Sequence, residues 1–410
     1  MAKQGIAPRL TDEQRFDWLR LVRSENVGPR TFRALINNCG GARAALEALP
    51  ELARRGGAAR PIRVASVQDV ERELLAARKM GVRFIALGEA DYPSALREID
   101  SAPPVIALRG RQEVLQQPAV AIVGSRNASA AGLTFADRLA RGLGQAGYIV
   151  VSGLARGIDQ RAHVATLATG AVGVLAGGHA RPYPSDVTPL IERMVELGAV
   201  VSEMPLEWEA RGRDFPRRNR IVSGLALGTV VVEAARGSGS LITARFALDQ
   251  NRQVFAVPGS PLDPRSEGTN DLIKQGATIC TGVDDVTTTL EPIRADDLRA
   301  MLEPGERGEP LWGEQALLGV NPEATPRTRP GDEFDDAGGS AYLAAGDAKA
   351  ARERIIALLG PTPITLDVLG RAAEASPRDV RVVLLELELA GRLEYSGGDR
   401  VALRVGTGGP

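Results

Sequence analysis

The sequence predicts an α/β protein whose core is a doubly wound parallel sheet, flanked by two smaller domains. Between residues 119 and 280, short and continuously apolar runs alternate with longer helical patterns. Such runs are typical of parallel strands that are covered on both faces. The pattern is helical before residue 60, and after residue 346 it indicates three helices and a two-stranded wing. We therefore predict a helical domain over 1–60, the core over 61–290, a linker over 291–346 and a winged-helix domain over 347–410.

The N-terminal segment carries start signals for two helices. Thr11 and Gln14 have the spacing of a capping box, and Pro29 follows Gly28 at the first turn of the next helix. The turn over 27–31 resembles the hairpin of helix-hairpin-helix and SAM-like domains, in some of which hairpin amides contact a nucleic-acid backbone. A role in packing or protein contact is the other interpretation, and we favour it.

The core is predicted to alternate strands with helices. We expect strands over 82–87, 105–108, 119–123, 148–152, 171–175, 199–202, 229–233, 253–257 and 277–280. We expect helices over 66–80, 129–145, 158–169, 187–197, 217–226, 240–250 and 269–275. This alternation implies right-handed crossovers, and such sheets bind ligands at the carboxyl ends of their strands.

The C-terminal part begins with a stretch rich in Pro, Gly, Glu and Asp, which predicts a flexible acidic linker. Trp312 within it either docks on a surface or is merely tolerated there. In the last domain the third helix is expected to begin at Ser376-Pro377, and it is the helix that would read DNA. Its charges are mixed and become acidic toward Glu388, so we favour a protein-contact or structural role over DNA reading.

Composition narrows the function classes. The chain has 410 residues, 44% of them apolar, and a net charge of −1, so nucleic-acid binding would need a local basic patch. Two cysteines and two histidines make a zinc site improbable, and we expect no metal and no cofactor. We find no apolar run of membrane-spanning length and no signal peptide, and we expect a protein of the reducing cytoplasm.

Four strand-end loops combine small residues with arginines. The first, Gly124-Ser125-Arg126, precedes a helix start at about residue 129, and a helix N-terminus favours anions. The second covers 152–159, and the third packs five arginines and Phe215 into residues 211–220. The fourth opens a helix near Ser238. The candidate binding residues are Gly124, Ser125, Arg126, Arg156, Arg211, Arg213, Phe215, Arg217, Arg218, Asn219, Arg220, Ser238, Gly239 and Ser240.

These loops are expected to meet at one edge of the sheet and to form a basic surface that includes an aromatic ring. A row of cations suits a polymer of phosphates. A ring such as Phe215 can stack on a base only where that base is unpaired. The combination favours single-stranded nucleic acid.

Catalytic groups are scarce, and we predict no catalytic residue. We expect Asp159 to stabilise its helix and loop and His163 to support packing. Glu203 and Glu233 are expected to pair with arginines, while His179 is placed where it can line the sheet edge.

Taken together, the loops resemble the DNA-processing DprA/Smf family. The matching segments are Val123–Arg126, Ser152–Asp159 with Ala162-His163, Tyr183-Pro184, Pro216–Gly224, Ser238–Ala244, Val254–Gly259 and Gly268–Ile273. The match covers about 85–285. Around Tyr183-Pro184 the chain departs from the family pattern with His179 and Asp186, so we assign that loop no role.

The resemblance implies an extended Rossmann-like core that binds single-stranded DNA without cutting it. It also implies a homodimer that protects incoming DNA and helps to load RecA recombinase in natural transformation. Carried over by position, Arg126 and the cluster over 211–220 would hold phosphates. Phe215 would stack on a base, and the amides of 238–240 would support the backbone.

A nucleotide-processing enzyme is the rival hypothesis. The core also resembles Rossmann proteins that act as nucleoside-monophosphate phosphoribohydrolases, which carry a working glutamate in a Gly-Gly-x-Gly-Thr-x-x-Glu loop. The corresponding stretch here, 237–245, contains no glutamate. Its absence favours binding over hydrolysis.

Overall fold

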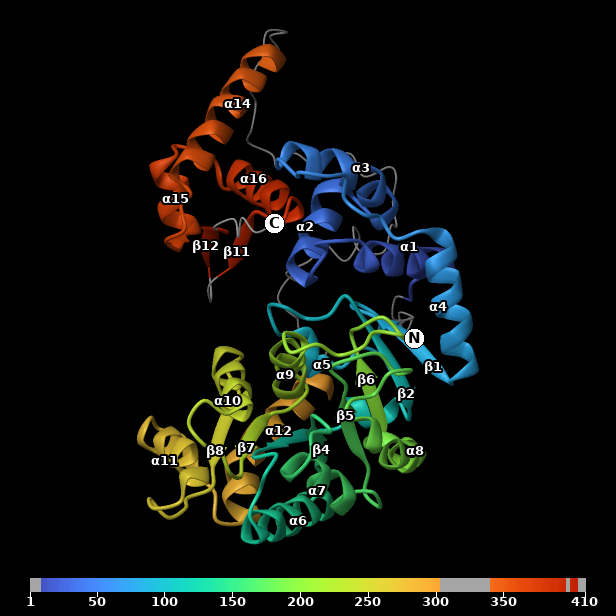
Figure 1. Cartoon of the computed structure of the whole chain (residues 1–410), viewed down its shortest axis with the longest axis vertical. Coiled ribbons are helices and arrows are strands. Elements are labelled where there is room, and N and C mark those ends of the chain that lie inside the picture. Colours follow the sequence, from blue (N-terminus) through green and yellow to red (C-terminus); the bar gives the residue numbers. More distant parts are fainter. Residues whose placement is uncertain (1–8, 303–339, 396–398, 405–410) are drawn as a thin grey trace, which may run out of the picture. The chain divides into compact units, whose positions relative to one another are not determined.

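A computed structural model of the chain describes residues 9–302, 340–395 and 399–404 (Figure 1). The chain divides into two compact units. We call residues 1–9 and 71–309 the core unit, and residues 10–70 and 310–410 the terminal unit.

A nine-stranded, mostly parallel sheet forms the centre of the core unit (Figure 1). The strands are β1 (Val82–Ala86), β2 (Val105–Gly110), β3 (Ala119–Val123), β4 (Ile149–Ser152), β5 (Ala171–Val174), β6 (Ala199–Ser202), β7 (Gly228–Val231), β8 (Gln253–Ala256) and β9 (Thr278–Ile279). Their order in space is β1-β2-β6-β5-β4-β3-β7-β8-β9. Strands β3 to β9 run parallel, whereas β1 and β2 add an antiparallel edge beside β6. The chain thus starts at β3, winds outward to β6 and returns to the other side of β3, which confirms the predicted double winding.

Helices flank these strands, and all of them except α5 and α12, which were not predicted, lie close to the predicted positions. They are α4 (Val67–Lys79), α5 (Ser94–Arg97), α6 (Ala130–Gln145), α7 (Ile158–Ala165), α8 (Thr188–Leu197), α9 (Asp214–Gly224), α10 (Gly239–Asp249), α11 (Glu267–Lys274) and α12 (Val283–Leu302). Short 3₁₀ turns lie at Glu113–Gln116, Ser185–Val187 and Pro264–Ser266. One difference matters for the site, because α9 starts at Asp214 rather than at residue 217.

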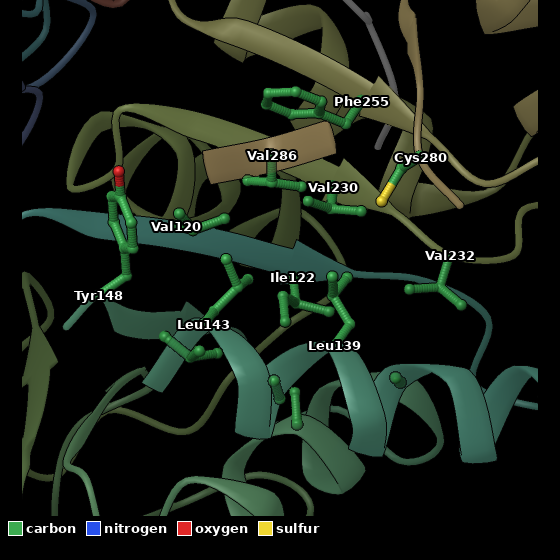
Figure 2. Close-up of a cluster of buried hydrophobic side chains, with 14 of the residues drawn as sticks. Val120, Ile122, Leu139, Leu143, Tyr148, Val230, Val232, Phe255, Cys280 and Val286 are labelled. Atoms are coloured by element: carbon green, nitrogen blue, oxygen red, sulfur yellow. The ribbon is translucent and has the colours of Figure 1, made fainter. Parts of the chain in front are cut away.

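The centre of the core unit is held by apolar contacts around β3, all of whose residues are buried. Figure 2 shows Ile122 of β3 close to Leu139 of α6, with Phe255 of β8 and Val286 of α12 in the same cluster. Burying such side chains stabilises the fold by roughly 1.5–3 kcal/mol each. The end of β3 is therefore a rigid base for the loop that follows it.

The terminal unit contains an N-terminal group of helices, α1 (Asp12–Arg23), α2 (Pro29–Cys39) and α3 (Ala42–Arg55). The predicted capping box is present, since the Thr11 side chain accepts from the amide of Gln14 and the Gln14 side chain accepts from the amide of Thr11. The winged helix is built from α14 (Ser340–Leu358), β10 (Ile364–Thr365), α15 (Leu366–Ala372), α16 (Pro377–Leu389), β11 (Leu393–Tyr395) and β12 (Arg400–Leu403). Its small sheet has the order β10-β12-β11, one short strand more than the predicted wing.

The segment predicted as a linker lies partly outside the described residues. Helix α12 continues to Leu302, past the expected boundary at 290, and α14 begins at Ser340, ahead of residue 347. Residues 303–339, with Trp312, are not described. Over the residues that are described, no helix is long and apolar enough to cross a bilayer.

Candidate nucleic-acid interface

A pocket of about 850 Å³ lies at the carboxyl ends of β3, β4, β5 and β6. Its walls come from the loops that follow these strands and from the first turns of α9. Of the predicted binding residues, the structure brings four to this pocket, namely Arg126, Arg156, Phe215 and Arg218. Three of the four predicted loops, those that follow β3, β4 and β6, therefore contribute to one pocket, while the fourth, after β7, does not line it.

Two aromatic rings and a cation form one side of the pocket. Phe215, in the first turn of α9, is half-buried, and its ring centre lies 5.2 Å from that of Tyr183 at an angle of 73°. The guanidinium carbon of Arg126 lies 5.3 Å from the centre of the Phe215 ring. Tyr183 is 51% exposed. The loop that carries Tyr183 was predicted to have no role, yet it follows β5 at the same sheet edge and lines the pocket.

Arg218 forms the floor of the pocket. It is only 6% exposed, and its Nη1 donates to the carbonyl of Val174 at 3.0 Å. Its guanidinium lies so close to Gly153 that a Cβ there would be 1.7 Å from Nη1, so a side chain at this position would displace the guanidinium. Burial lowers the pKa of Arg218 to about 10, while the charge of Asp159 opposes that shift.

Asp159 holds the loop that follows β4, and Arg218 lies against this loop. Its Oδ2 accepts from the amides of Gly153 at 3.1 Å and Ala155 at 3.4 Å. Burial raises the pKa of this carboxyl, and the charge of Arg218 opposes the rise. This confirms the expectation that Asp159 stabilises its loop.

The arginine cluster is largely helical, which corrects the expectation for its last residues. Because α9 begins at Asp214, Asn219 and Arg220 turn into the protein and are buried. Arg220 pairs with Glu203, which also lies 3.4 Å from Arg217. The Asn219 amide nitrogen donates to the carbonyl of Gly239 at 3.1 Å. Asn219 and Arg220 therefore support α9, and Glu203 pairs with arginines as expected.

The start of α6 corrects a second expectation. Glu233, just after β7, accepts from the backbone amide of Ser129 at 3.0 Å and from its hydroxyl at 2.5 Å. A Cβ on Gly132 would lie 2.5 Å from this carboxylate. The helix N-terminus therefore already holds an anion of the protein itself, and among the described residues Glu233 is bound by Ser129 and not by the predicted arginine. Gly124 and Ser125 shape this turn, in which Ser125 Oγ accepts from the amide of Asn127.

The remaining candidates lie around the pocket or beside it. Arg211 stacks on Trp208 at 5.0 Å, Arg213 is exposed, and Arg156 pairs with Asp186 at 3.0 Å on the surface. In the fourth loop, Ser238 caps α10. Residues 238–240 follow β7 and are not among the residues that line the pocket.

Both histidines are buried away from the pocket surface. His163 has no exposed surface, as its packing role requires. The Nε2 atom of His179 lies 3.1 Å from the carbonyl of Ala107, so His179 does not line the sheet edge as expected. Within the described parts of the chain, no three His, Cys, Asp or Glu side chains group as metal ligands.

The buried pair of Glu203 and Arg220 yields a stability prediction. Arg220→Ala leaves Glu203 in the protein without its closest cation, and such a loss costs about 3–5 kcal/mol. We expect urea unfolding, followed by circular dichroism, to show this decrease. Arg213→Ala at the exposed start of α9 is the control and is expected to change stability by less than about 0.5 kcal/mol. Equal stabilities of the two variants would show that the pair is not structural.

The two histidines yield a pH prediction. Burial lowers the pKa of His163 to about 3 and that of His179 to about 4, from 6.5. The unfolded chain therefore binds protons below pH 6.5 that the folded core does not bind. Stability is complete above pH 6.5 and falls below it, by up to about 1.4 kcal/mol per pH unit for each histidine. Since the chain has only two histidines, His179→Gln should remove about half of the histidine contribution to the slope between pH 6.5 and 5. An unchanged slope would contradict the assignment.

Comparison with known proteins agrees with this architecture. The family model described as DNA recombination-mediator protein A matches residues 83–291, a DprA-like N-terminal HHH domain matches 12–76, and a DprA winged helix domain matches 340–399.

The DNA processing protein DprA of Bacillus subtilis is 40% identical over 218 residues, which cover 52% of this chain and 73% of that protein. A putative DNA processing protein DprA of Mycobacterium tuberculosis is 32% identical over 87% of this chain and 85% of its own length. The X-ray structure of DprA from Streptococcus pneumoniae superposes with a TM-score of 0.56 at 30% identity, and the match covers 68% of this chain and 98% of that one. The chain therefore belongs to the DprA/Smf family of DNA-processing proteins.

Proposed function

We propose that this protein binds single-stranded DNA in the pocket beyond β3 to β6, protects it, and helps to load RecA recombinase onto it during natural transformation. The observation that carries the DNA-binding part is the group formed by Arg126, Phe215 and Tyr183 at the pocket. RecA loading, a homodimer and a cytoplasmic location rest on the family to which the chain belongs.

The pocket suits an unpaired base beside a phosphate. A base can stack on the half-buried Phe215 ring, and Tyr183 at 5.2 Å offers a second ring for the same base or its neighbour. Arg126 has no carboxylate partner within the described residues, so its charge is available to a phosphate. A base inside a duplex cannot enter such a pocket without unpairing, which favours single strands.

The candidate residues then divide by exposure. Arg126, Arg156, Arg211, Arg213, Arg217 and Phe215 are exposed or half-buried and are proposed to contact DNA. Arg218, at the floor of the pocket, contributes positive charge that would attract the phosphates. Asn219 and Arg220 hold α9 in place. Gly124 and Ser125 set the turn that presents Arg126. The backbone amides of Ser238, Gly239 and Ser240 follow β7, which is the neighbour of β3 in the sheet. There they would contact the phosphates of a DNA strand that extends past the pocket.

We propose binding rather than catalysis. No glutamate lies in the stretch 237–245, where a phosphoribohydrolase of this fold would need one. Incubation with nucleoside monophosphates should release no free base. Release with turnover would overturn the proposal in favour of an enzyme.

Replacing Arg126 tests the phosphate contact. Arg126→Ala should weaken binding to an oligothymidine strand and reduce the salt slope of log K by about 0.7–1. Arg141→Ala is the matched control, since Arg141 is an exposed arginine of α6 that pairs with Asp137 at 2.7 Å and does not line the pocket. A slope that stays the same in Arg126→Ala would remove Arg126 from the interface.

Replacing Phe215 tests the stacking. Phe215→Ala should lower affinity by about 1–3 kcal/mol with little change in salt slope, because the ring carries no charge. Phe215→Trp keeps a stacking surface and should retain most of the affinity. A change in the salt slope without a loss of affinity at fixed salt would contradict stacking. The same titrations with duplex DNA, and with RecA present, test strand preference and loading.

A further inference from the structure

Helix α16 of the winged helix has two apolar faces. One face, which includes Val383 and Leu387, packs into the core of the winged helix. Leu385 and Leu389 lie one turn apart, belong to no part of that cluster, and are nevertheless buried. A helix that is apolar on both sides needs a cover on both sides. In the DNA-reading class of winged helices this is the helix that enters the groove.

The N-terminal helices of the same unit cover the second face. Helix α16 packs against α2 and α3 (Figure 1). The side-chain nitrogen of Asn26 donates to the carbonyl of Leu389 at 2.9 Å. Arg30, in the first turn of α2, lies 5.0 Å from the ring centre of Tyr395 in β11. The hairpin that resembles a nucleic-acid contact is thus turned toward the winged helix.

A buried carboxylate adds specificity to this contact. Glu386 is 3% exposed, and it lies 3.1 Å from Arg352 of its own domain and 3.9 Å from Arg55 at the end of α3. Arg352 also donates to the carbonyl of Arg55. A buried charge is tolerated only where partners compensate it. Arginines of both domains therefore share one acidic side chain of α16.

Gly56, the residue after α3, is adapted to this neighbour. Its φ of −66° and ψ of −8° suit any residue, so its own backbone does not require glycine. A Cβ there would lie 1.9 Å from the carbonyl oxygen of Glu386. From the other side, Arg392 donates to the Gly56 carbonyl at 3.2 Å. The approach of α16 is what excludes a side chain at this position.

We propose that the N-terminal helical domain is the partner of the winged helix, and that the second face of α16 is a protein-binding surface rather than a DNA-reading one. Residues 10–60 then fold as one cooperative unit with residues 349–395 and 399–404, although the residues of the core unit separate them in the sequence. The acidic Glu386 and the apolar Leu385 and Leu389 suit a basic, half-apolar protein face, whereas a phosphate backbone would repel the carboxylate.

Gly56→Gln in the full chain tests the contact by amide hydrogen exchange. The new side chain has no strain of its own and collides only with α16, so α16 should lose protection by about tenfold or more although the substitution lies in the other domain. Gly28→Gln is the matched control, because a Cβ at Gly28 meets no atom within 4 Å. Unchanged protection of α16 in Gly56→Gln would overturn the proposal.

A second variant guards against local unfolding of the N-terminal domain. Arg392→Ala changes only the winged-helix side, so a loss of protection at the end of α3 supports the shared unit. Full protection there would count against it.

A third variant tests the exclusion of DNA. Arg378 and Arg381 are the exposed cations in the first half of α16. Arg378→Ala combined with Arg381→Ala should leave the affinity for duplex and single-stranded DNA unchanged. A several-fold loss of affinity would overturn the proposal, because α16 would then contact DNA.

Discussion

The shape of the candidate interface depends on one buried cation. Arg218 ties α9 to β5 through the Val174 carbonyl and lies against the backbone of Gly153. A charge in such a place needs compensation, and Asp159 supplies it while its carboxylate holds the amides of the loop after β4. Three segments are therefore fixed relative to one another by a single group of interactions. The aromatic ring of Phe215, one turn earlier on α9, gains its position from the same anchor.

Internal carboxylates decide which cations are left for a ligand. The Glu233 carboxylate binds at the N-terminus of α6, and Glu203 forms an ion pair with Arg220. A doubly wound sheet would bind a nucleotide in the crevice between β3 and β7. In this chain the carboxylate of Glu233 lies at that crevice. Positive charge remains on the other side of β3, beyond β4 to β6. With a net charge of −1, the molecule can attract a polyanion only through such a local excess.

The strands and the sheet edge could be predicted because their signal is local. A run such as 119–123 is apolar throughout, and every parallel strand ends at the same edge. The fate of individual arginines could not be predicted. Whether Arg220 faces solvent depends on where α9 begins and on Glu203, which lies on a different element. Tyr183 could have been found by treating the loop after β5 like the other strand-end loops.

The partner of helix α16 could not be predicted from the sequence either, because that partner is far away along the chain. Its apolar residues cover more than one face, which indicates a partner on the second side. Nothing local identifies that partner, since Asn26 and Leu389 are 363 positions apart. A partner in the same chain is present at a high effective concentration, so a few hydrogen bonds and one shared carboxylate can hold the two domains together. This contact is selective for its partner. Against a surface that lacks arginines, the charge of the buried Glu386 carboxylate would have no compensating cation.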